Sequence, residues 1–240
     1  MSNLDLNYYC RVYDNFLDAD LCDFYVNEFE RLLVDEAEKI EKYKICKAAT
    51  RPDGTTYCGA CNCQRLDPMQ HEVFNETNKQ ILFEKIPLLH DRYKEDYNLH
   101  AAQFPKSYSV EALRMKRVLR EDGSSTAQQF TEHVDVSSWG KGKRFLAILI
   151  YLNDDFGGGE TVFPTFGDSI KPKKGSVLVF PPYWCYLHAG RPLTDYGYAK
   201  YYMLSFLNYN DTFNDVTAMS TNISVDNYLK AFNDGAIKSK

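Results

Sequence analysis

The sequence feature that most constrains the fold is an unbroken apolar run, FLAILIYL, at residues 145–152. The run is far too short to cross a bilayer as a helix. It lies between a basic turn and the sequence Asn-Asp-Asp, and a Gly-Gly-Gly turn follows at residues 157–159. We therefore predict a central β-strand that is buried on both faces, because every position of such a strand is covered.

Shorter strands are predicted on both sides of this run. Apolar and polar residues alternate over residues 113–119, and Gly and Pro separate three further stretches, 160–163, 176–180 and 200–207. Aromatic residues make up 15% of the 240 residues, including 18 Tyr and 15 Phe. Because Tyr and Phe favour strands and line pockets, this composition indicates β structure around a cavity.

The N-terminal part of the chain has a helical pattern. After an opening strand and turn over residues 1–17, Asp18 or Asp20 is placed to cap a helix that runs to about Tyr43. Apolar residues recur at helical spacing along this stretch, and Glu and Lys fill its other face. Residues 44–67 show no sustained periodicity of apolar residues and are predicted to form a loop.

A second helical segment is predicted to begin at Asp67, where Asp-Pro provides an N-cap followed by Pro at the first helical position. Pro87 should break or restart this segment, and the second piece should reach about Tyr97. The last 30 residues are polar, with a short helix predicted near residues 225–232. Helices first and strands afterwards predict an α+β fold, in which helices pack on one side of a β core.

Charge and cysteine content limit the partners and the compartment. The formal net charge is −5, which gives no electrostatic reason to bind nucleic acid or a membrane, and we predict neither partner. The basic residues Lys141, Lys143 and Arg144 are predicted to form a solvated turn before a strand. Seven cysteines, an odd number, without an export signal at the N-terminus favour reduced thiols and a cytoplasmic protein.

Three of the cysteines form a cluster. Cys58, Cys61 and Cys63 are followed by His71, and three thiols with one imidazole can make a tetrahedral zinc site. The spacing is not that of a familiar zinc finger, and no second cysteine pair follows. We expect free thiols in an active-site loop, with structural zinc as the alternative.

The chemically informative segment is Thr-Glu-His-Val-Asp, which ends at Asp135. In an extended chain His133 and Asp135 project from the same face and into the same cavity. Two histidines and one carboxylate on one face of an iron ion leave the opposite positions open for co-substrate and O₂. The third ligand must come from a distant strand, and His188 follows the predicted strand VLVFPP and an aromatic cluster.

A cation suited to an acidic ligand comes later in the chain. Lys200 begins the strand KYYMLSFL, in which Tyr202 and Leu204 would share its face. A lysine that points with such neighbours into a barrel is costly unless an anion meets it, and the distal carboxylate of 2-oxoglutarate is such an anion. The alternative is a strand-end lysine that reaches water. Arg191, three residues after His188, is the competing cation.

Together these segments resemble one known family. The sequence His133-x-Asp135, then YLNDDFGGGETVFP (151–164), IKPKKGSVLVFPP (170–182) and His188-Ala-Gly-Arg-Pro with a later lysine is very similar to the catalytic domain of prolyl 4-hydroxylases. These enzymes are Fe(II)- and 2-oxoglutarate-dependent dioxygenases. The resemblance covers about residues 108–208, and FLDADLCDFYVNEF near the start is similar to the helical lead-in of small bacterial and viral members.

The resemblance implies a double-stranded β-helix, or jelly roll, as the core of the α+β fold, with N-terminal supporting helices. We divide the chain accordingly into a helical support region at residues 1–105, a dioxygenase core at 106–210 and a C-terminal tail at 211–240. The resemblance also implies roles for single residues. The implied iron ligands and catalytic residues are His133, Asp135 and His188. The implied anchor of 2-oxoglutarate is Lys200, and Thr161 is a further candidate contact. Arg191 stays the competing cation for this role.

The chain departs from the family pattern on the strands that precede the first ligand. Arg117 is followed by Val118, where the family often has Arg-Tyr. Phe130 occupies the place of a tyrosine that bonds the co-substrate in many members, and it has no hydroxyl group. Tyr108 and Tyr202 are candidates to supply a replacement hydroxyl.

The implied activity is hydroxylation of peptidyl proline, in a proline-containing peptide or protein, with decarboxylation of 2-oxoglutarate to succinate. Its cofactors are Fe(II), the co-substrate 2-oxoglutarate and O₂, with ascorbate as an optional addition. One alternative is an oxygenase of the same fold that acts on a free amino acid or another small molecule. Another is a non-catalytic jelly-roll binding module. Aromatic residues that flank the ligands in sequence are candidates to line a substrate groove: Trp139, Tyr183, Trp184 and Tyr186.

Overall fold

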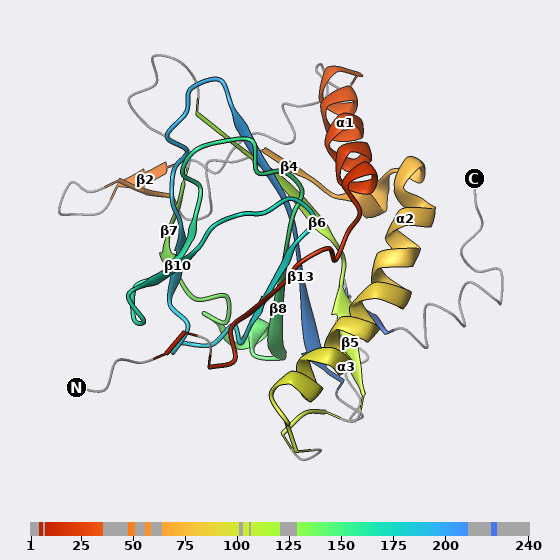
Figure 1. Cartoon of the computed structure of the whole chain (residues 1–240), viewed down its shortest axis with the longest axis vertical. Coiled ribbons are helices and arrows are strands. Elements are labelled where there is room, and N and C mark those ends of the chain that lie inside the picture. Colours follow the sequence, from red (N-terminus) through yellow and green to blue (C-terminus); the bar gives the residue numbers. More distant parts are fainter. Residues whose placement is uncertain are drawn as a thin grey trace.

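Two antiparallel sheets and a set of helices make up three layers (Figure 1). In this view the larger sheet lies in the middle, with the helices on one side of it and the smaller sheet on the other. The predicted combination of antiparallel β structure with N-terminal helices is therefore confirmed. The computed structural model describes residues 5–6, 8–35, 48–50, 56–58, 64–100, 103–105, 107–120, 129–210 and 222–224.

The larger sheet has eight strands, and all of its neighbouring pairs are antiparallel. The main path runs in the order β1-β11-β8-β13-β5-β14, while β6 pairs with both β13 and β4. The strands are β1 (Arg11–Tyr13), β4 (Gln64–Leu66), β5 (Tyr108–Glu111), β6 (Arg114–Leu119), β8 (Arg144–Tyr151), β11 (Val177–Phe180), β13 (Ala199–Tyr209) and β14 (Asn222–Ser224).

The smaller sheet has four strands in the order β10-β9-β12-β7. They are β7 (Phe130–His133), β9 (Thr161–Phe163), β10 (Asp168–Ile170) and β12 (His188–Gly190). A separate hairpin consists of β2 (Ala48–Thr50) and β3 (Thr56–Cys58). The prediction of a loop over residues 44–67 is wrong at β2, β3 and β4. Each of these strands has only three residues, which is too short for an alternating pattern to appear in the sequence.

The helical layer contains α1 (Ala19–Asp35), η2 (Pro68–Gln70), η3 (Glu72–Phe74), α2 (Asn75–Lys79), the π-helical turn η4 (Gln80–Lys85) and α3 (Ile86–Asp96). Asp67 caps η2 as predicted, because its side chain accepts a hydrogen bond from the Met69 N–H at 3.1 Å. Pro87 lies at the start of α3, where its missing N–H does not break the helical path. The end of the first predicted helix, after Asp35, and the helix predicted near 225–232 lie outside the described residues.

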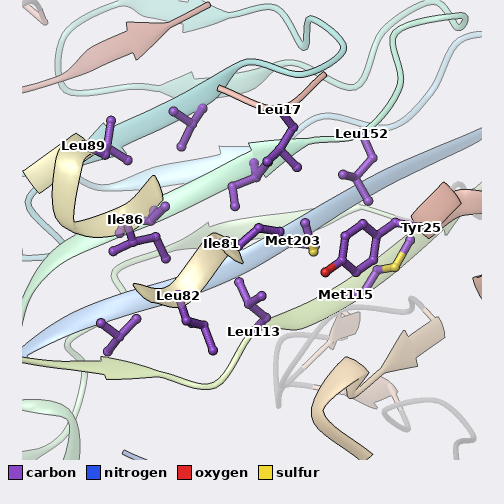
Figure 2. Packing of buried hydrophobic residues seen from close by; sticks show 14 of the residues in the cluster. Leu17, Tyr25, Ile81, Leu82, Ile86, Leu89, Leu113, Met115, Leu152 and Met203 are labelled. Atoms are coloured by element: carbon purple, nitrogen blue, oxygen red, sulfur yellow. The ribbon is translucent and has the colours of Figure 1, made fainter. Parts of the chain in front are cut away.

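The packing of β8 explains why its sequence is apolar at every position after Arg144. Four of its side chains pack in the cluster shared with the helices: Phe145, Leu146, Ile148 and Ile150. Three others pack in the cluster between the two sheets: Ala147, Leu149 and Tyr151. The predicted central strand, buried on both faces, is thus confirmed. Figure 2 shows part of the helix-side cluster, in which Ile81 and Ile86 lie near Met203 of β13.

A buried ion pair joins β5 to β8. The Arg144 guanidinium donates to both carboxylate oxygens of Glu111, at 2.5 and 2.8 Å, and lies 3.8 Å from the ring centroid of Phe206. The prediction that Arg144 belongs to a solvated turn is therefore wrong, although Lys141 is exposed. The carboxylate partner precedes Arg144 by 33 residues, so no local pattern indicates it. Among the helices of the described ranges, none is long and apolar enough to cross a membrane.

We predict that Glu111→Gln lowers the free energy of unfolding by about 3–5 kcal/mol, because it leaves the buried Arg144 charge without its partner. Urea denaturation measures this loss. The control is Glu76→Gln, which removes the exposed pair between Glu76 and Lys79 and should cost about 1 kcal/mol or less. Equal losses in the two variants would contradict this account of the Glu111 pair.

Candidate metal centre

Strand pairing brings the three predicted ligands together. His133 ends β7, Asp135 follows two residues later, and His188 begins β12. The antiparallel ladder of β7 and β12 places His133 directly opposite His188, with ring centroids 4.4 Å apart. One possible ligand atom from each of the three residues lies within 4.8 Å of the others. The group therefore has the size and composition of a metal site.

Backbone hydrogen bonds determine which nitrogen of each histidine is free. Nδ1 of His133 lies 2.7 Å from the Thr131 carbonyl oxygen, and Nδ1 of His188 lies 3.0 Å from the Tyr186 carbonyl oxygen. A carbonyl oxygen only accepts, so Nδ1 carries the proton in both rings. In the neutral form of each ring Nε2 is then the free nitrogen, and the two Nε2 atoms lie 3.8 and 3.6 Å from the carboxylate oxygens of Asp135. This is the tautomer that metal-binding histidines use.

Burial keeps His188 in the neutral form that a metal requires. Its side chain is buried, and desolvation lowers the pKa of His188 below the usual value although the Asp135 carboxylate raises it. The neighbouring His133 lowers the pKa of His188 further. Two neutral imidazoles and one carboxylate are a donor set that Fe(II) accepts, so the residues present fit this ion.

The three residues line a small cavity of about 70 Å³ between the two sheets. Two of the predicted co-substrate contacts, Lys200 and Thr161, also line it, whereas Arg191 does not and is exposed. The full lining consists of Lys116, Phe130, His133, Asp135, Leu149, Thr161, Phe180, His188, Gly190, Lys200, Tyr202 and Leu204. A larger cavity of about 450 Å³ lies beside α1 and contains none of the predicted site residues.

Lys200 reaches this cavity from β13 and is 5% exposed. Its Nζ donates to the Gly159 carbonyl oxygen at 2.6 Å and lies 5.3 Å from the ring centroids of Tyr151 and Tyr202. No ion pair to Lys200 occurs among the described residues. Burial lowers the pKa of Lys200 to about 7, with the Glu160 charge acting in the opposite direction. The side chain thus lacks the anionic partner that would favour its charged form.

Gly159 makes room for this lysine. Its φ is +72°, and a Cβ at this position would come within 2.9 Å of Leu193 Cδ2 and Phe156 Cε2. The same Cβ would stand 3.4 Å from Lys200 Cδ. Because glycine adopts this backbone conformation readily and has no side chain, the turn brings its carbonyl oxygen close to the ammonium group.

The hydroxyl groups expected near the cavity lie in different places. Thr161 is buried, and its Oγ1 is 2.8 Å from the Tyr151 hydroxyl oxygen. Of the two tyrosines considered as replacements for a hydroxyl at Phe130, Tyr202 lines the cavity. Tyr108 does not line it; its ring lies 4.4 Å from that of His90, in the helical layer.

One cavity residue, Lys116, has no counterpart in the sequence predictions. It lies on β6 opposite Tyr202 of β13, so the register between two distant strands turns it inward. The alternation over residues 113–119 does not identify it as a site residue. In the predicted cysteine cluster, Cys61, Cys63 and the side chain of Cys58 lie outside the described residues.

Two histidines and a carboxylate on neighbouring strand ends of an antiparallel sheet, with open space beside them, are the ligand set typical of non-haem iron oxygenases. Residues 118–208 match the family model of the 2OG-Fe(II) oxygenase superfamily. The resemblance predicted from the sequence motifs is thereby confirmed for this part of the chain. The predicted cofactors, Fe(II), 2-oxoglutarate and O₂, agree with this family, and the match supports a 2-oxoglutarate-dependent dioxygenase.

A curated relative is similar to part of the chain. A putative prolyl 4-hydroxylase of Acanthamoeba polyphaga mimivirus is 40% identical over 81 residues, which are 30% of this chain and 31% of the relative. The chain thus matches about a third of that relative's length.

Two solved structures resemble the fold over most of the chain. The viral collagen prolyl hydroxylase of Paramecium Bursaria Chlorella virus-1, solved as a 2OG complex, has a TM-score of 0.54 at 22% identity and covers 85% of this chain and 97% of its own. A prolyl-4-hydroxylase of Pseudomonas putida has a TM-score of 0.54 at 15% identity and covers 86% and 96%. At these identities the two structures establish similarity of fold alone.

We predict that His133→Ala, Asp135→Ala and His188→Ala each weaken Mn(II) binding by more than roughly 100-fold. Loss of a residue that only hydrogen-bonds to a metal ligand already costs roughly 10- to 100-fold in affinity. Each substitution removes one of the three predicted ligands. Calorimetric titration of the metal-free protein with Mn(II) measures the affinity, and thermal unfolding checks that each variant is folded. The matched control, His100→Ala, removes an exposed histidine outside the cavity and should bind Mn(II) normally. Normal affinity in one of the three variants would remove that residue from the ligand set.

Proposed function

We propose that this protein is an Fe(II)- and 2-oxoglutarate-dependent dioxygenase that hydroxylates peptidyl proline. His133, Asp135 and His188 hold the iron, and Lys200 binds the distal carboxylate of 2-oxoglutarate. Thr161 lies at the same end of the cavity and contributes its hydroxyl to that contact. The competing cation, Arg191, is less suited to this role because it is exposed and does not line the cavity.

One observation carries the proposal: two histidines and a carboxylate share a single small cavity with a buried lysine that lacks an anionic partner among the described residues. A binding module without catalysis has no need of two histidines whose Nε2 atoms both turn to a carboxylate, next to a buried cation. The arrangement of these four residues therefore disfavours the non-catalytic alternative, whatever the substrate is.

Bound Fe(II) supplies the oxidising chemistry, in which O₂ converts 2-oxoglutarate to succinate and CO₂ and adds one oxygen atom to a substrate C–H bond. The residues of the chain orient the reactants. The two histidines present neutral Nε2 atoms, Asp135 contributes one negative charge, and Lys200 fixes the far end of the co-substrate. Apolar side chains on the cavity wall limit the entry of water: Leu149, Phe180 and Leu204.

The finer features of the fold are part of the same proposal. The larger and smaller sheets, which face each other across the inter-sheet cluster, are the two sides of a double-stranded β-helix. Residues 106–210 form this core, residues 1–105 support it, and residues 211–240 form the tail. A cytoplasmic location and an ascorbate requirement remain predictions from the sequence and the resemblance.

The surface near the metal centre suits an extended proline-rich substrate. Trp139, four residues after Asp135, is 93% exposed, and Trp184, four residues before His188, is 82% exposed. The two segments are joined by a hydrogen bond from the Val136 N–H to the Pro182 carbonyl oxygen at 3.1 Å. Exposed aromatic side chains bind the preformed helix of proline-rich peptides at low entropic cost. By contrast Tyr186 is buried in the inter-sheet cluster.

The rival substrate is a free amino acid or another small molecule. The proposed co-substrate occupies this small cavity, so any substrate must approach from its mouth. The exposed tryptophans favour a peptide there, because a small molecule needs no extended aromatic surface.

We predict that Lys200→Ala weakens 2-oxoglutarate binding on the order of ten- to a hundredfold and leaves Mn(II) binding nearly unchanged. The reason is that a charge-assisted hydrogen bond is worth about 1.5–3 kcal/mol. The measurement is a titration of 2-oxoglutarate into the Mn(II)-loaded protein. Arg191→Ala is the matched control and should bind normally. If Arg191→Ala loses affinity and Lys200→Ala does not, the anchor is misassigned.

The pH dependence gives a second measure of this contact. The pKa of Lys200 is about 7 without a ligand, so above that pH the lysine takes up a proton when a carboxylate binds. Affinity for 2-oxoglutarate should therefore fall above pH 7, by at most about tenfold per pH unit, and should be insensitive to this group below pH 7. This dependence should disappear in Lys200→Ala.

We predict that a proline-rich peptide gains one oxygen atom at proline only when Fe(II), 2-oxoglutarate and O₂ are all present. Mass spectrometry of a peptide panel, with free proline and free lysine alongside, measures the product. Trp184→Ala should raise KM for the peptide about five- to thirtyfold, as expected for loss of an aromatic contact worth about 1–2 kcal/mol.

The matched control for this variant is Leu88→Ala, which removes an exposed apolar side chain from α3, on the other side of the larger sheet. It should leave KM unchanged. Hydroxylation of a free amino acid alone would instead establish the small-molecule rival.

A further inference from the structure

A second cation lines the cavity, on a strand of the larger sheet. Lys116 lies on β6, directly opposite Tyr202 in the ladder with β13. Its Nζ is 4.5 Å from the ring centroid of Phe130 and 5.8 Å from that of Tyr202. Lys116 lines the same cavity as Lys200, and its charge is close enough to lower the pKa of His188.

The environment of Lys116 differs from that of its neighbour Arg117. Arg117 points to the helical face, where it pairs with Glu30 at 3.1 Å and donates to the Tyr201 hydroxyl at 3.1 Å. Lys116 is half-buried and has no carboxylate partner among the described residues. The faces of two aromatic rings make up only part of the hydration energy that the ammonium group loses on burial. An anionic ligand in the cavity would supply the missing counter-charge.

The position of the two lysines indicates that both cations can serve the same ligand. Lys116 and Lys200 line one small cavity, so a single acidic ligand bound there can meet both charges. Lys200 lies at the deep end, against Gly159 and Tyr151. Lys116 is half-buried and lies over Phe130, whose ring centroid is 6.3 Å from that of His133. Two positive groups at different depths fit a dicarboxylate.

We propose that Lys116 binds the carboxylate of 2-oxoglutarate at the metal end, while Lys200 binds the distal one. This inference rests on the proposed function. It also accounts for Phe130, because the Lys116 ammonium lies over the ring at the position that lacks a hydroxyl group. Lys116 is then a co-substrate ligand and a determinant of specificity for 2-oxo acids.

The test uses two acids that differ at one end. 2-Oxoglutarate has both carboxylates, whereas 2-oxopentanoate keeps the 2-oxo acid group and lacks the distal carboxylate. Both are titrated calorimetrically into Mn(II)-loaded protein. Lys116→Met should weaken both acids by a similar factor, about tenfold, as loss of one charge-assisted hydrogen bond predicts. Lys200→Met should weaken 2-oxoglutarate only.

Two further variants make the result specific. Lys116→Arg keeps the charge and should lose less affinity than Lys116→Met. Lys141→Met removes an exposed lysine from η5 (Trp139–Lys141) and should bind both acids normally, which controls for net charge.

If Lys116→Met binds both acids as tightly as the unsubstituted protein does, the proposed role of Lys116 is wrong. The proposed function is not affected by that result. A loss confined to 2-oxoglutarate also overturns the proposed role of Lys116, because Lys116 would then act at the distal end. If the unsubstituted protein binds neither acid, the proposed function itself fails, together with the inference that rests on it.

Discussion

The pairing of β7 with β12 is the interaction on which the site depends. It brings His133 and His188, which are far apart in the sequence, opposite each other in one ladder. The same backbone supplies the carbonyl oxygens that fix both Nδ1 protons, at Thr131 and Tyr186. A slip of one residue in this register would turn a ligand to the other face of the sheet. The ladder therefore specifies both the position and the tautomer of the histidines.

The larger sheet makes this pairing possible because it is covered on both faces. Its helix side is a continuous apolar cluster, while its other side carries both apolar packing and the site. Two buried cations of the larger sheet differ in the groups that surround their charge. Arg144 has the Glu111 carboxylate as a partner within the protein, which makes it structural. Lys200 has a carbonyl oxygen and two rings but, within the described ranges, no carboxylate partner, which makes it suited to an anionic ligand.

Local patterns in the sequence predict some parts of this structure and not others. The strand β8 and the helix cap at Asp67 follow from periodicity and capping residues, and His133 with Asp135 from the spacing of an extended chain. The motifs identify His188 and Lys200 through resemblance. The pocket-facing position of Lys116 and the partner of Arg144 depend on register between distant strands, which no local pattern encodes. The three-residue strands β2, β3 and β4 are too short to produce a pattern.

The central claim is that one cavity holds the metal through three side chains and the co-substrate through a lysine. A crystal structure of the protein with Mn(II) and 2-oxoglutarate, with the metal located by anomalous scattering, tests it most directly. The account predicts Mn(II) bound to Nε2 of both His133 and His188 and to the Asp135 carboxylate, with the distal carboxylate on Lys200. Mn(II) bound elsewhere, or a distal carboxylate held by Arg191, would contradict it.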